Sequence, residues 1–240
     1  MFALAGLAIE VEGVLPRALA PFERPGRGEL SLLLCACEEL GSQRLQVERC
    51  GGDYACAGDG LNGRVGPAEA ELCAWGGEGA LLAALRLACA LWLLPRGGLL
   101  LHGACVERDG AAHVFVGESG AGKTTLSRAL GGGRARVISD ELSCVKEGRV
   151  FGHPFPRRLG DGCAPDAGLR LGSLSAISHG AAFRRAPLTG ALAARALLRR
   201  VFLPARDAAS LALAVDSAAR LRIEALELPL DERAAREALP

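Results

Sequence analysis

The stretch Gly117-Glu118-Ser119-Gly120-Ala121-Gly122-Lys123-Thr124 decides the fold of this chain, because it matches the pattern Gly-x-x-x-x-Gly-Lys-Ser/Thr at every fixed position. Glycines let such a loop curl so that its backbone N–H groups point inward, toward phosphate oxygens, at the start of a helix. We expect Lys123 to reach the outer phosphates of a bound nucleotide and the Thr124 hydroxyl to ligate Mg²⁺. The predicted nucleotide-binding set is therefore residues 117–124 together with Thr125.

Lysine is rare in this chain, and its rarity makes the motif specific. Only Lys123 and Lys146 are lysines among the 28 lysine and arginine residues. A compact ammonium and a planar guanidinium are not interchangeable inside a phosphate nest. An accidental lysine between the glycine and the threonine has odds of roughly two in a thousand from this composition. The alternative, a structural glycine loop without a ligand, is therefore the weaker interpretation.

The segments on both sides of the loop have the pattern that a phosphate loop requires. Residues 112–116 form a short apolar run with β-branched and aromatic side chains, which predicts a strand. Residues 125–130 predict a helix that ends at a run of glycines. Another apolar run, at 135–138, predicts a core strand with Asp140 and Glu141 at its carboxyl end. In open α/β sheets ligands bind at the carboxyl ends of strands, so we expect these acids beside the loop.

Around this centre the chain divides into two predicted parts. Residues 1–75 contain alternating apolar and polar runs separated by glycine turns, which predicts a small β-rich N-terminal subdomain. Residues 76–240 are predicted to form an α/β nucleotide-binding core. Its further predicted elements are a buried helix at 78–94, a hairpin at 145–155 with its turn at Glu147-Gly148, helices at 191–202, 208–219 and 231–239, and a strand at 222–228.

Composition and charge limit the classes of partner. Half of the residues are apolar, which suffices for a sizeable core. The net charge of +1 supplies no field for nucleic acid or for an anionic membrane. Nine cysteines in an irregular set, without any Cys-x-x-Cys pair, favour reduced intracellular thiols over a disulfide framework. We predict a cytoplasmic protein without a nucleic-acid or membrane partner, and the oligomeric state stays open.

No segment is predicted to target or anchor the chain. The N-terminus has no basic leader and reaches acidic residues at Glu10 and Glu12, unlike a secretory signal. The longest apolar segment, 80–94, is interrupted by Arg86 and ends at Pro95. Its apolar residues predict a buried core helix. Its length predicts that it is too short to span a bilayer.

Polar groups near the loop are candidates for chemistry. Phosphoryl transfer needs the phosphates held, their charge neutralised and an acceptor hydroxyl placed beside a base. Asp140 could accept the proton of that hydroxyl or hold Mg²⁺, with Glu141 in the other role; the alternative is that Asp140 caps a turn. His102 follows three leucines, where a lone histidine is more often a hydrogen-bonded core residue than a catalytic one. The arginine pairs at 157–158 and 199–200 are either solvated or directed at phosphate.

Three segments carry a more specific pattern than the loop alone. They are Leu101-His102-Gly103-Ala104-Cys105-Val106, the strand and loop at 114–124, and Val137-Ile138-Ser139-Asp140-Glu141. Together, over residues 99 to about 142, they resemble the catalytic core of HPr serine kinases and their shorter relatives. The resemblance implies the P-loop fold of phosphoenolpyruvate carboxykinase type, with ATP and Mg²⁺ as cofactors. It also implies phosphorylation of a serine in a peptide or small protein, since some shorter relatives phosphorylate peptides made in biosynthetic clusters.

The resemblance also assigns roles to individual residues. It implies that Asp140 is the base toward a serine hydroxyl and that His102 lies close to the transferred phosphoryl group. It further implies that Lys123 and Thr124 bind phosphates and Mg²⁺.

The chain departs from that family in three respects. Glu141 stands where a second aspartate is usual, and Thr125 replaces the usual acid after the loop Ser/Thr. The glycine-rich C-terminal signature of the bifunctional enzymes is not found in the sequence. Reverse phosphorolysis, hexameric assembly and HPr itself as the substrate are therefore not implied.

Other phosphate-loop proteins fit the sequence less well. A carboxykinase needs a second metal site with lysine and histidine ligands, and Lys146 is the only other lysine. A GTPase needs an Asn-Lys-x-Asp motif, but Lys146 follows Val145. An ABC ATPase would show a Leu-Ser-Gly-Gly-type signature, which does not occur. The alternative from another class is an ATP-binding regulatory module, or a degenerate kinase that binds nucleotide without phosphoryl transfer.

Overall fold

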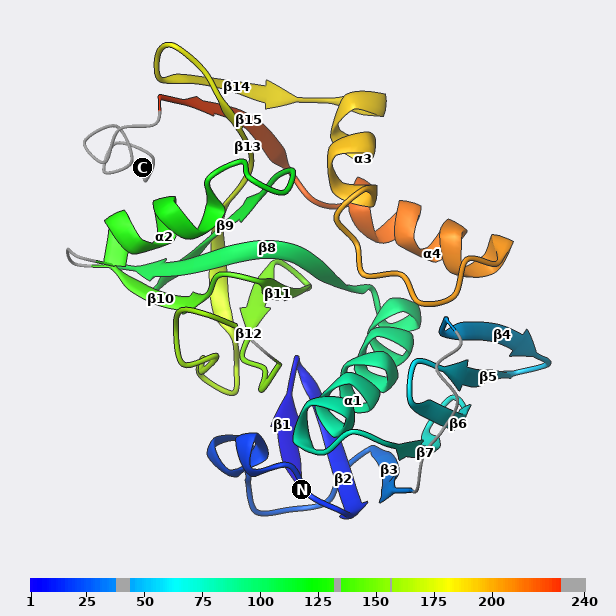
Figure 1. The fold of residues 1–240 in the computed structure, drawn as a ribbon. Helices are drawn as coiled ribbons and strands as arrows, with labels where there is room; N and C mark the ends of the chain where they lie inside the picture. Colours follow the sequence, from blue (N-terminus) through cyan, green and yellow to red (C-terminus); the bar gives the residue numbers. More distant parts are fainter. Residues whose placement is uncertain (38–43, 132–134, 156, 230–240) are drawn as a thin grey trace.

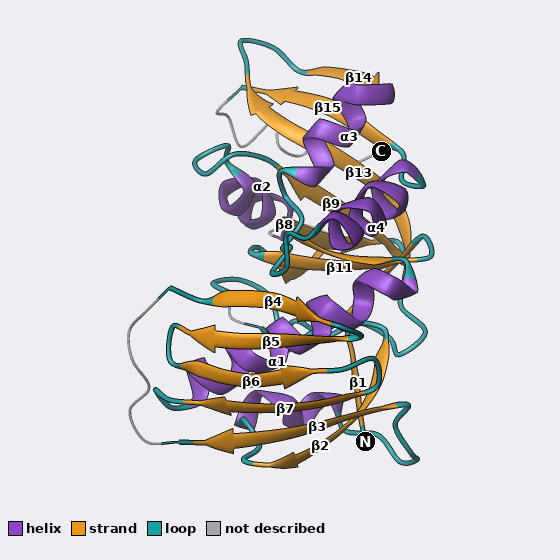
Figure 2. Ribbon diagram, turned by 90° about the vertical axis from the view of Figure 1, so that its right-hand side faces the viewer, coloured by secondary structure: helices purple, strands orange, loops and turns teal. Residues whose placement is uncertain are grey.

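The computed structural model describes residues 1–37, 44–131, 135–155 and 157–229. The protein has a mixed α/β fold with two mixed β-sheets and few helices (Figure 1, Figure 2). The first sheet occupies the lower part of Figure 1 and the second sheet, which carries the phosphate loop, the upper part. The α/β class predicted from the sequence is confirmed at this level.

The first sheet has seven strands, so residues 1–75 are β-rich as predicted. The strand order is β1-β2-β3-β7-β6-β5-β4. β2, β3 and β7 run parallel to one another, and the other neighbours are antiparallel. The elements are β1 (Phe2–Leu4), β2 (Leu7–Gly13), a 3₁₀ helix (Arg17–Phe22), β3 (Leu30–Ala36), β4 (Gln46–Cys50), β5 (Asp53–Gly58), β6 (Leu61–Val65) and β7 (Glu69–Ala74).

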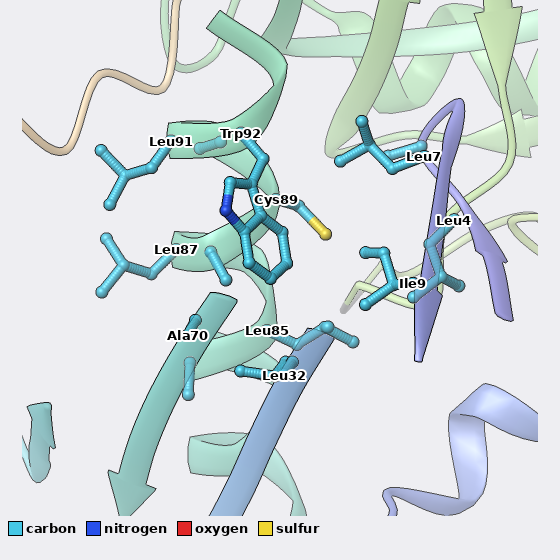
Figure 3. Packing of buried hydrophobic residues seen from close by; sticks show 14 of the residues in the cluster. Leu4, Leu7, Ile9, Leu32, Ala70, Leu85, Leu87, Cys89, Leu91 and Trp92 are labelled. Atoms are coloured by element: carbon cyan, nitrogen blue, oxygen red, sulfur yellow. The ribbon is translucent and has the colours of Figure 1, made fainter. Parts of the chain in front are cut away.

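Helix α1 (Glu78–Leu93) packs against the first sheet and fills its core (Figure 3). Strand alternation turns every second side chain of the sheet toward one face, and Leu32 and Leu72 are fully buried there. Trp92, near the end of the helix, is buried, and its indole N–H donates to the carbonyl oxygen of Gly66 at 2.8 Å. Each fully buried leucine contributes about 1.5–3 kcal/mol, so helix and sheet stabilise each other.

The apolar segment around α1 is longer than the sequence prediction allowed. The helix continues as a 3₁₀ turn (Leu94–Arg96), and Glu78–Arg96 spans 19 residues with a mean hydropathy of 1.5. By length and composition it could cross a membrane, so the prediction that it is too short to do so is wrong. In the structure 67% of its most apolar stretch is buried inside the protein, which makes it the core helix that was also predicted.

The second sheet has eight strands in the order β10-β8-β11-β12-β13-β15-β14, and β9 pairs with both β8 and β13. Helix α2 follows β9, and helices α3 and α4 lie between β14 and β15 in the chain. The elements are β8 (Gly98–Arg108), β9 (Ala111–Val116), α2 (Lys123–Gly131), β10 (Arg136–Ser139), β11 (Leu142–Lys146), β12 (Arg149–Phe151), β13 (Leu169–His179), β14 (Arg184–Leu188), α3 (Gly190–Leu198), α4 (Ala208–Ala219) and β15 (Ile223–Leu228).

Several of these elements lie where the sequence predicts them. The strand, loop and helix around the phosphate motif, the hairpin with its turn at Glu147-Gly148, and the helix at 208–219 are confirmed. Helix α3 is shorter than predicted and ends at Leu198. It stops because the chain turns back to β8, where the N–H of Phe202 donates to the carbonyl oxygen of Leu100 at 2.7 Å.

Strands β13 and β14 of the second sheet were not predicted. β13 mixes buried and exposed positions without regular alternation, and all but one residue of β14 is exposed, so neither has a clear strand pattern. The helix predicted at 231–239 lies outside the described residues.

Strand β8 organises the second sheet, because its two halves pair with different strands. From Gly98 to His102 it pairs with β11, and from Gly103 onward it lies between β9 and β10, antiparallel to all three. β9 and β10 are therefore parallel to each other and end at the same edge. β10, which precedes Asp140, is thus separated by β8 from β9, which precedes the loop. The pairings β8-β11-β12-β13-β9 form a closed ring, and residues of these strands share an apolar cluster with α3 and α4.

The two sheets are joined through a common core. The N–H of Ala5 donates to the carbonyl oxygen of Gly152 at 2.7 Å, and the Cys144 thiol donates to the carbonyl oxygen of Ala5 at 3.0 Å. Leu142 and Phe155, from the second half, belong to the apolar cluster that includes α1 and the first sheet. The first sheet and α1 therefore pack directly against residues of the second half, Leu142 and Phe155 among them.

Candidate active site

The predicted phosphate loop, residues 117–124, joins the end of β9 to the start of α2. A Cβ on Gly117 would lie 2.9 Å from the carbonyl oxygen of Ile177, so the backbone approach there needs glycine. Gly120 and Gly122 have φ angles of 82° and 90°, which other residues rarely adopt. A Cβ on Gly120 would meet nothing within 4 Å, so the loop is open on that side.

Lys123 is the first residue of α2 and turns its ammonium back into the loop. Its Nζ donates to the carbonyl oxygens of Gly117 at 3.0 Å and Glu118 at 3.1 Å, and the residue is only 8% exposed. Burial lowers the pKa of Lys123 and the nearby Arg200 guanidinium lowers it further, whereas two nearby carboxylates raise it. The ammonium is held by neutral carbonyls in a partly desolvated place, where an anionic ligand would stabilise its charge.

Asp140 lies in the bend after β10 and is 1% exposed. Its Oδ2 accepts a hydrogen bond from the Thr124 hydroxyl at 3.1 Å. Its Oδ1 accepts from the backbone N–H groups of Arg158 and Leu159, each at 2.9 Å. Asp140 therefore connects α2 to the segment after β12, whereas the turn that follows β10 is capped by the Ser139 hydroxyl.

His102 lies on β8 at the point where that strand changes its pairing partner from β11 to β9. Its backbone N–H donates to the carbonyl oxygen of Arg200 at 2.6 Å, and the next N–H, of Gly103, donates to the carbonyl oxygen of Glu141 at 3.1 Å. Burial lowers the pKa of the His102 imidazole and the Lys123 ammonium lowers it further, while Glu141 opposes them. His102 is therefore neutral at pH 7, and a ring nitrogen can accept a hydrogen bond or a proton.

An ion pair connects the loop to the last third of the chain. The Glu118 carboxylate binds the guanidinium of Arg200, which follows α3. The Arg200 side chain is 14% exposed and that of Glu118 70% exposed. The hydrogen bond from Arg200 and its positive charge lower the pKa of Glu118. The contact holds the Arg200 guanidinium beside the phosphate loop.

A pocket of about 580 Å³ lies beside His102 and Glu141. Its lining contains five guanidinium groups and one carboxylate, that of Glu141, within the described parts of the chain. Leu142, Val201 and Phe202 supply an apolar wall. We call it the arginine pocket, after Arg86, Arg157, Arg158, Arg199 and Arg200.

The structure brings the predicted site residues into two adjoining groups. Lys123, Thr124 and Asp140 lie on the loop side, linked by the contacts above. His102 and Glu141 line the arginine pocket. Ser119, Gly120 and Thr125 are exposed, and Ala121 and Gly122 are partly exposed. No cluster of three or more His, Cys, Asp or Glu side chains arranged for a metal ion occurs among the residues that the structure describes; the predicted Mg²⁺ set relies on a threonine hydroxyl and two acids.

The sequence did not predict the contacts of Arg157 or the presence of Arg86 at the site. Arg157 had been expected to contact phosphate or lie in solvent, but its guanidinium donates to the carbonyl oxygens of Phe155 and Gly160, both at 3.0 Å, and to that of Asp161. It shapes the loop it belongs to. Arg86 was seen only as an interruption of an apolar helix, and no sequence signal connected it with residues 199–200.

A scan against models of known protein families found no match, and a search of curated proteins also found none.

Proposed function

We propose that this protein is a kinase that uses ATP and Mg²⁺ to phosphorylate a hydroxyl, a serine in the first instance, of a peptide or small protein. The observation that carries the proposal is the 3.1 Å contact between Thr124 Oγ1 and Asp140 Oδ2. A hydroxyl and a carboxylate at that spacing, next to a phosphate loop with its lysine, supply the oxygen ligands that Mg²⁺ prefers in nucleotide sites. The resemblance to HPr serine kinases supports the same assignment, and the fold of that family is part of the proposal.

The residues of the loop fit a nucleoside triphosphate and its metal. Gly120 and Gly122 hold backbone conformations that favour inward N–H groups, and the space beside Gly120 is open. Among the described residues, the hydrogen-bond partners of the Lys123 ammonium are carbonyl oxygens of the loop, so an incoming phosphate offers it a stronger, charged acceptor. The bound Mg²⁺ would neutralise the charge that develops on the transferred group.

We assign Asp140 to the metal side of the site. Both of its oxygens already accept hydrogen bonds, one from Thr124 and one from two backbone N–H groups. These contacts fix the orientation of the carboxylate and keep it beside the Thr124 hydroxyl, the group expected to ligate Mg²⁺. The resemblance implies instead that Asp140 is the base, and metal rescue, described in the Discussion, separates the two roles.

His102 and Glu141 are the groups on the acceptor side. Both line the arginine pocket, and His102 is neutral at pH 7 because burial lowers its pKa. A neutral imidazole can orient the acceptor hydroxyl and accept its proton, and the Glu141 carboxylate can do the same. The candidates for the base are therefore His102 and Glu141 and, as the resemblance implies, Asp140.

The first test is nucleotide binding. We expect Lys123→Ala to weaken ATP binding about a hundredfold or more, because it removes the only ammonium in the loop. Arg128→Gln, which changes an exposed basic residue of the same helix, is the matched control and should leave the affinity unchanged. Isothermal titration with Mg-ATP measures both, and unchanged binding by Lys123→Ala would overturn the placement of this lysine.

The second test is phosphoryl transfer. Incubation with γ-labelled ATP, Mg²⁺ and serine peptides encoded by neighbouring genes should yield a labelled peptide. An intact, tight ATP site with no labelled product from any such peptide would favour the alternative, an ATP-binding regulatory module or degenerate kinase.

A further inference from the structure

We propose that the arginine pocket is the acceptor subsite and that it selects an acidic peptide, one in which carboxylates flank the serine. This inference rests on the proposed kinase function and names its substrate class. It follows from where the pocket lies, from which guanidinium groups are uncommitted, and from the mixed character of its walls.

The pocket opens on the acceptor side of the candidate site. Glu141 lines it and is the residue next to Asp140, and His102 lines it from β8. Arg200 belongs to its lining and also binds Glu118 of the phosphate loop, so pocket and loop share a border. Whatever occupies this pocket is therefore next to the place where the outer phosphates of a nucleotide would end.

Two of the five guanidinium groups, those of Arg86 and Arg199, form no ion pair within the described parts of the chain, and that of Arg158 forms only a distant one. The Arg86 guanidinium lies over the Phe202 ring at 4.8 Å, and its buried Nε has no hydrogen-bond partner among the described residues. Arg199 is exposed and forms no ion pair within the described parts of the chain. Arg158 is held only by a long 3.8 Å contact with Glu141, and its side chain is 81% exposed. Arg157 and Arg200 are committed to other partners.

The excess of positive charge is local. The whole chain carries a net charge of +1, whereas the lining of the pocket includes five arginines and one carboxylate, that of Glu141, and the Glu118 carboxylate of the loop neutralises only one of these arginines, Arg200. Guanidinium forks bind carboxylates in a bidentate manner, which fixes orientation as well as charge. The ligand that complements this pocket is anionic.

The walls favour a peptide. Leu142, Val201 and Phe202 add apolar surface to the lining, which suits side chains next to the acidic residues of a peptide. Its volume of about 580 Å³ is within the range of ordinary ligand pockets and holds a few residues. A serine presented between acidic residues would place its hydroxyl toward His102 and Glu141.

Peptide binding without nucleotide tests this directly. Fluorescence anisotropy would compare a labelled peptide whose serine is flanked by glutamates with the same peptide carrying glutamines. We expect the acidic peptide to bind wild-type protein about tenfold more tightly, as two or three charge-assisted contacts would give. Arg158→Gln combined with Arg199→Gln should remove most of that preference, and both side chains are exposed, so the variant should fold. Arg195→Gln, an exposed change on α3 outside the pocket, should keep the preference.

Charge reversal gives an independent readout. Arg199→Glu should lose the acidic peptide and gain affinity for a lysine-flanked counterpart. Equal binding of the glutamate and glutamine peptides by wild type overturns the proposal, even if the protein phosphorylates both. A loss of binding in Arg195→Gln as large as that in the double variant also overturns it. So does inorganic phosphate that displaces both peptides when the two peptides bind equally. An acidic preference without phosphoryl transfer would keep this subsite and remove the kinase function, so the two failures are distinguishable.

Discussion

The two sheets differ in what they bury. The core of the first sheet and α1 consists of apolar side chains, whereas all ten buried polar or charged residues in the described parts of the chain lie beyond β8, from His113 to Ser217. A buried polar group is costly unless it is hydrogen-bonded, so such groups are kept where partners or function require them. Under the proposed function, the first sheet would serve as a scaffold and the second sheet would hold the site.

The second half contributes residues to the apolar core of the first sheet, but the described residues of the first sheet contribute none to the candidate site. Residues of the second half, such as Leu142 and Phe155, reach into the apolar cluster of the first, but every candidate site residue comes from the second half except Arg86 of α1. Substitutions in the first sheet and α1 should therefore lower stability and leave function nearly unchanged. Substitutions at the site should lower function and leave stability nearly unchanged. The following predictions test that division, beginning with the largest effect.

Asp140→Asn should reduce phosphoryl transfer about a thousandfold, or about 4 kcal/mol, and leave ATP binding and stability nearly unchanged. The amide is close in shape, and its oxygen can still accept the two backbone N–H groups. Transfer assays with ATP and a serine peptide measure the loss. Partial recovery at high Mn²⁺ or Mg²⁺ would support the ligand role, and a loss that no metal concentration alters would support the base role implied by the resemblance.

Leu72→Ala should lower the free energy of unfolding by about 3 kcal/mol, because it leaves a cavity among fully buried side chains. Urea unfolding measures this effect. The affinity for ATP at a temperature where the variant is folded should match that of wild type. A large change in ATP affinity would contradict the assignment of the first sheet as scaffold.

His153 should make stability fall in acid. Complete burial lowers its pKa to about 4, against the ordinary 6.5, so below pH 6.5 the unfolded chain takes a proton that the folded protein does not. Stability from this group is present above pH 6.5 and is lost as the pH falls toward 4, by on the order of 2 kcal/mol. His153→Phe should therefore flatten the dependence of urea midpoints on pH between 7.5 and about 4.5. The destabilisation by Leu72→Ala should be the same at both pH values, since all four histidines lie in the second half.

Trp92→Phe should have the smallest effect, about 1 kcal/mol in the free energy of unfolding. It removes the 2.8 Å hydrogen bond from the indole to the Gly66 carbonyl and keeps most of the apolar contact. Thermal melts followed by circular dichroism would show a modest decrease, and a loss above about 3 kcal/mol would mean that packing around Trp92, and not the hydrogen bond, dominates.

The sequence predicts the local part of the site well and the non-local part poorly. The strand, glycine loop and Lys123 form one continuous segment whose conformation its own residues determine, so they could be found directly. Asp140 was expected beside the loop, and its contact with the Thr124 hydroxyl lies there, but the position of β8 between β9 and β10 was not expected. The arginine pocket could not be predicted, because it combines α1 with residues near 158 and 200, and only tertiary packing brings those segments together.

Strand β8 also determines where the length of this chain can vary through evolution. Its eleven residues include His102 and pair with β9, β10 and β11. Insertion of one residue within it would reverse the direction of every following side chain and move His102 or its neighbours to the opposite face. Relatives of this protein should therefore keep a constant spacing from Gly98 to the loop at Gly117, with length differences gathered in the turns of the first sheet, such as Gly51-Gly52, whose added Cβ atoms would meet nothing within 4 Å.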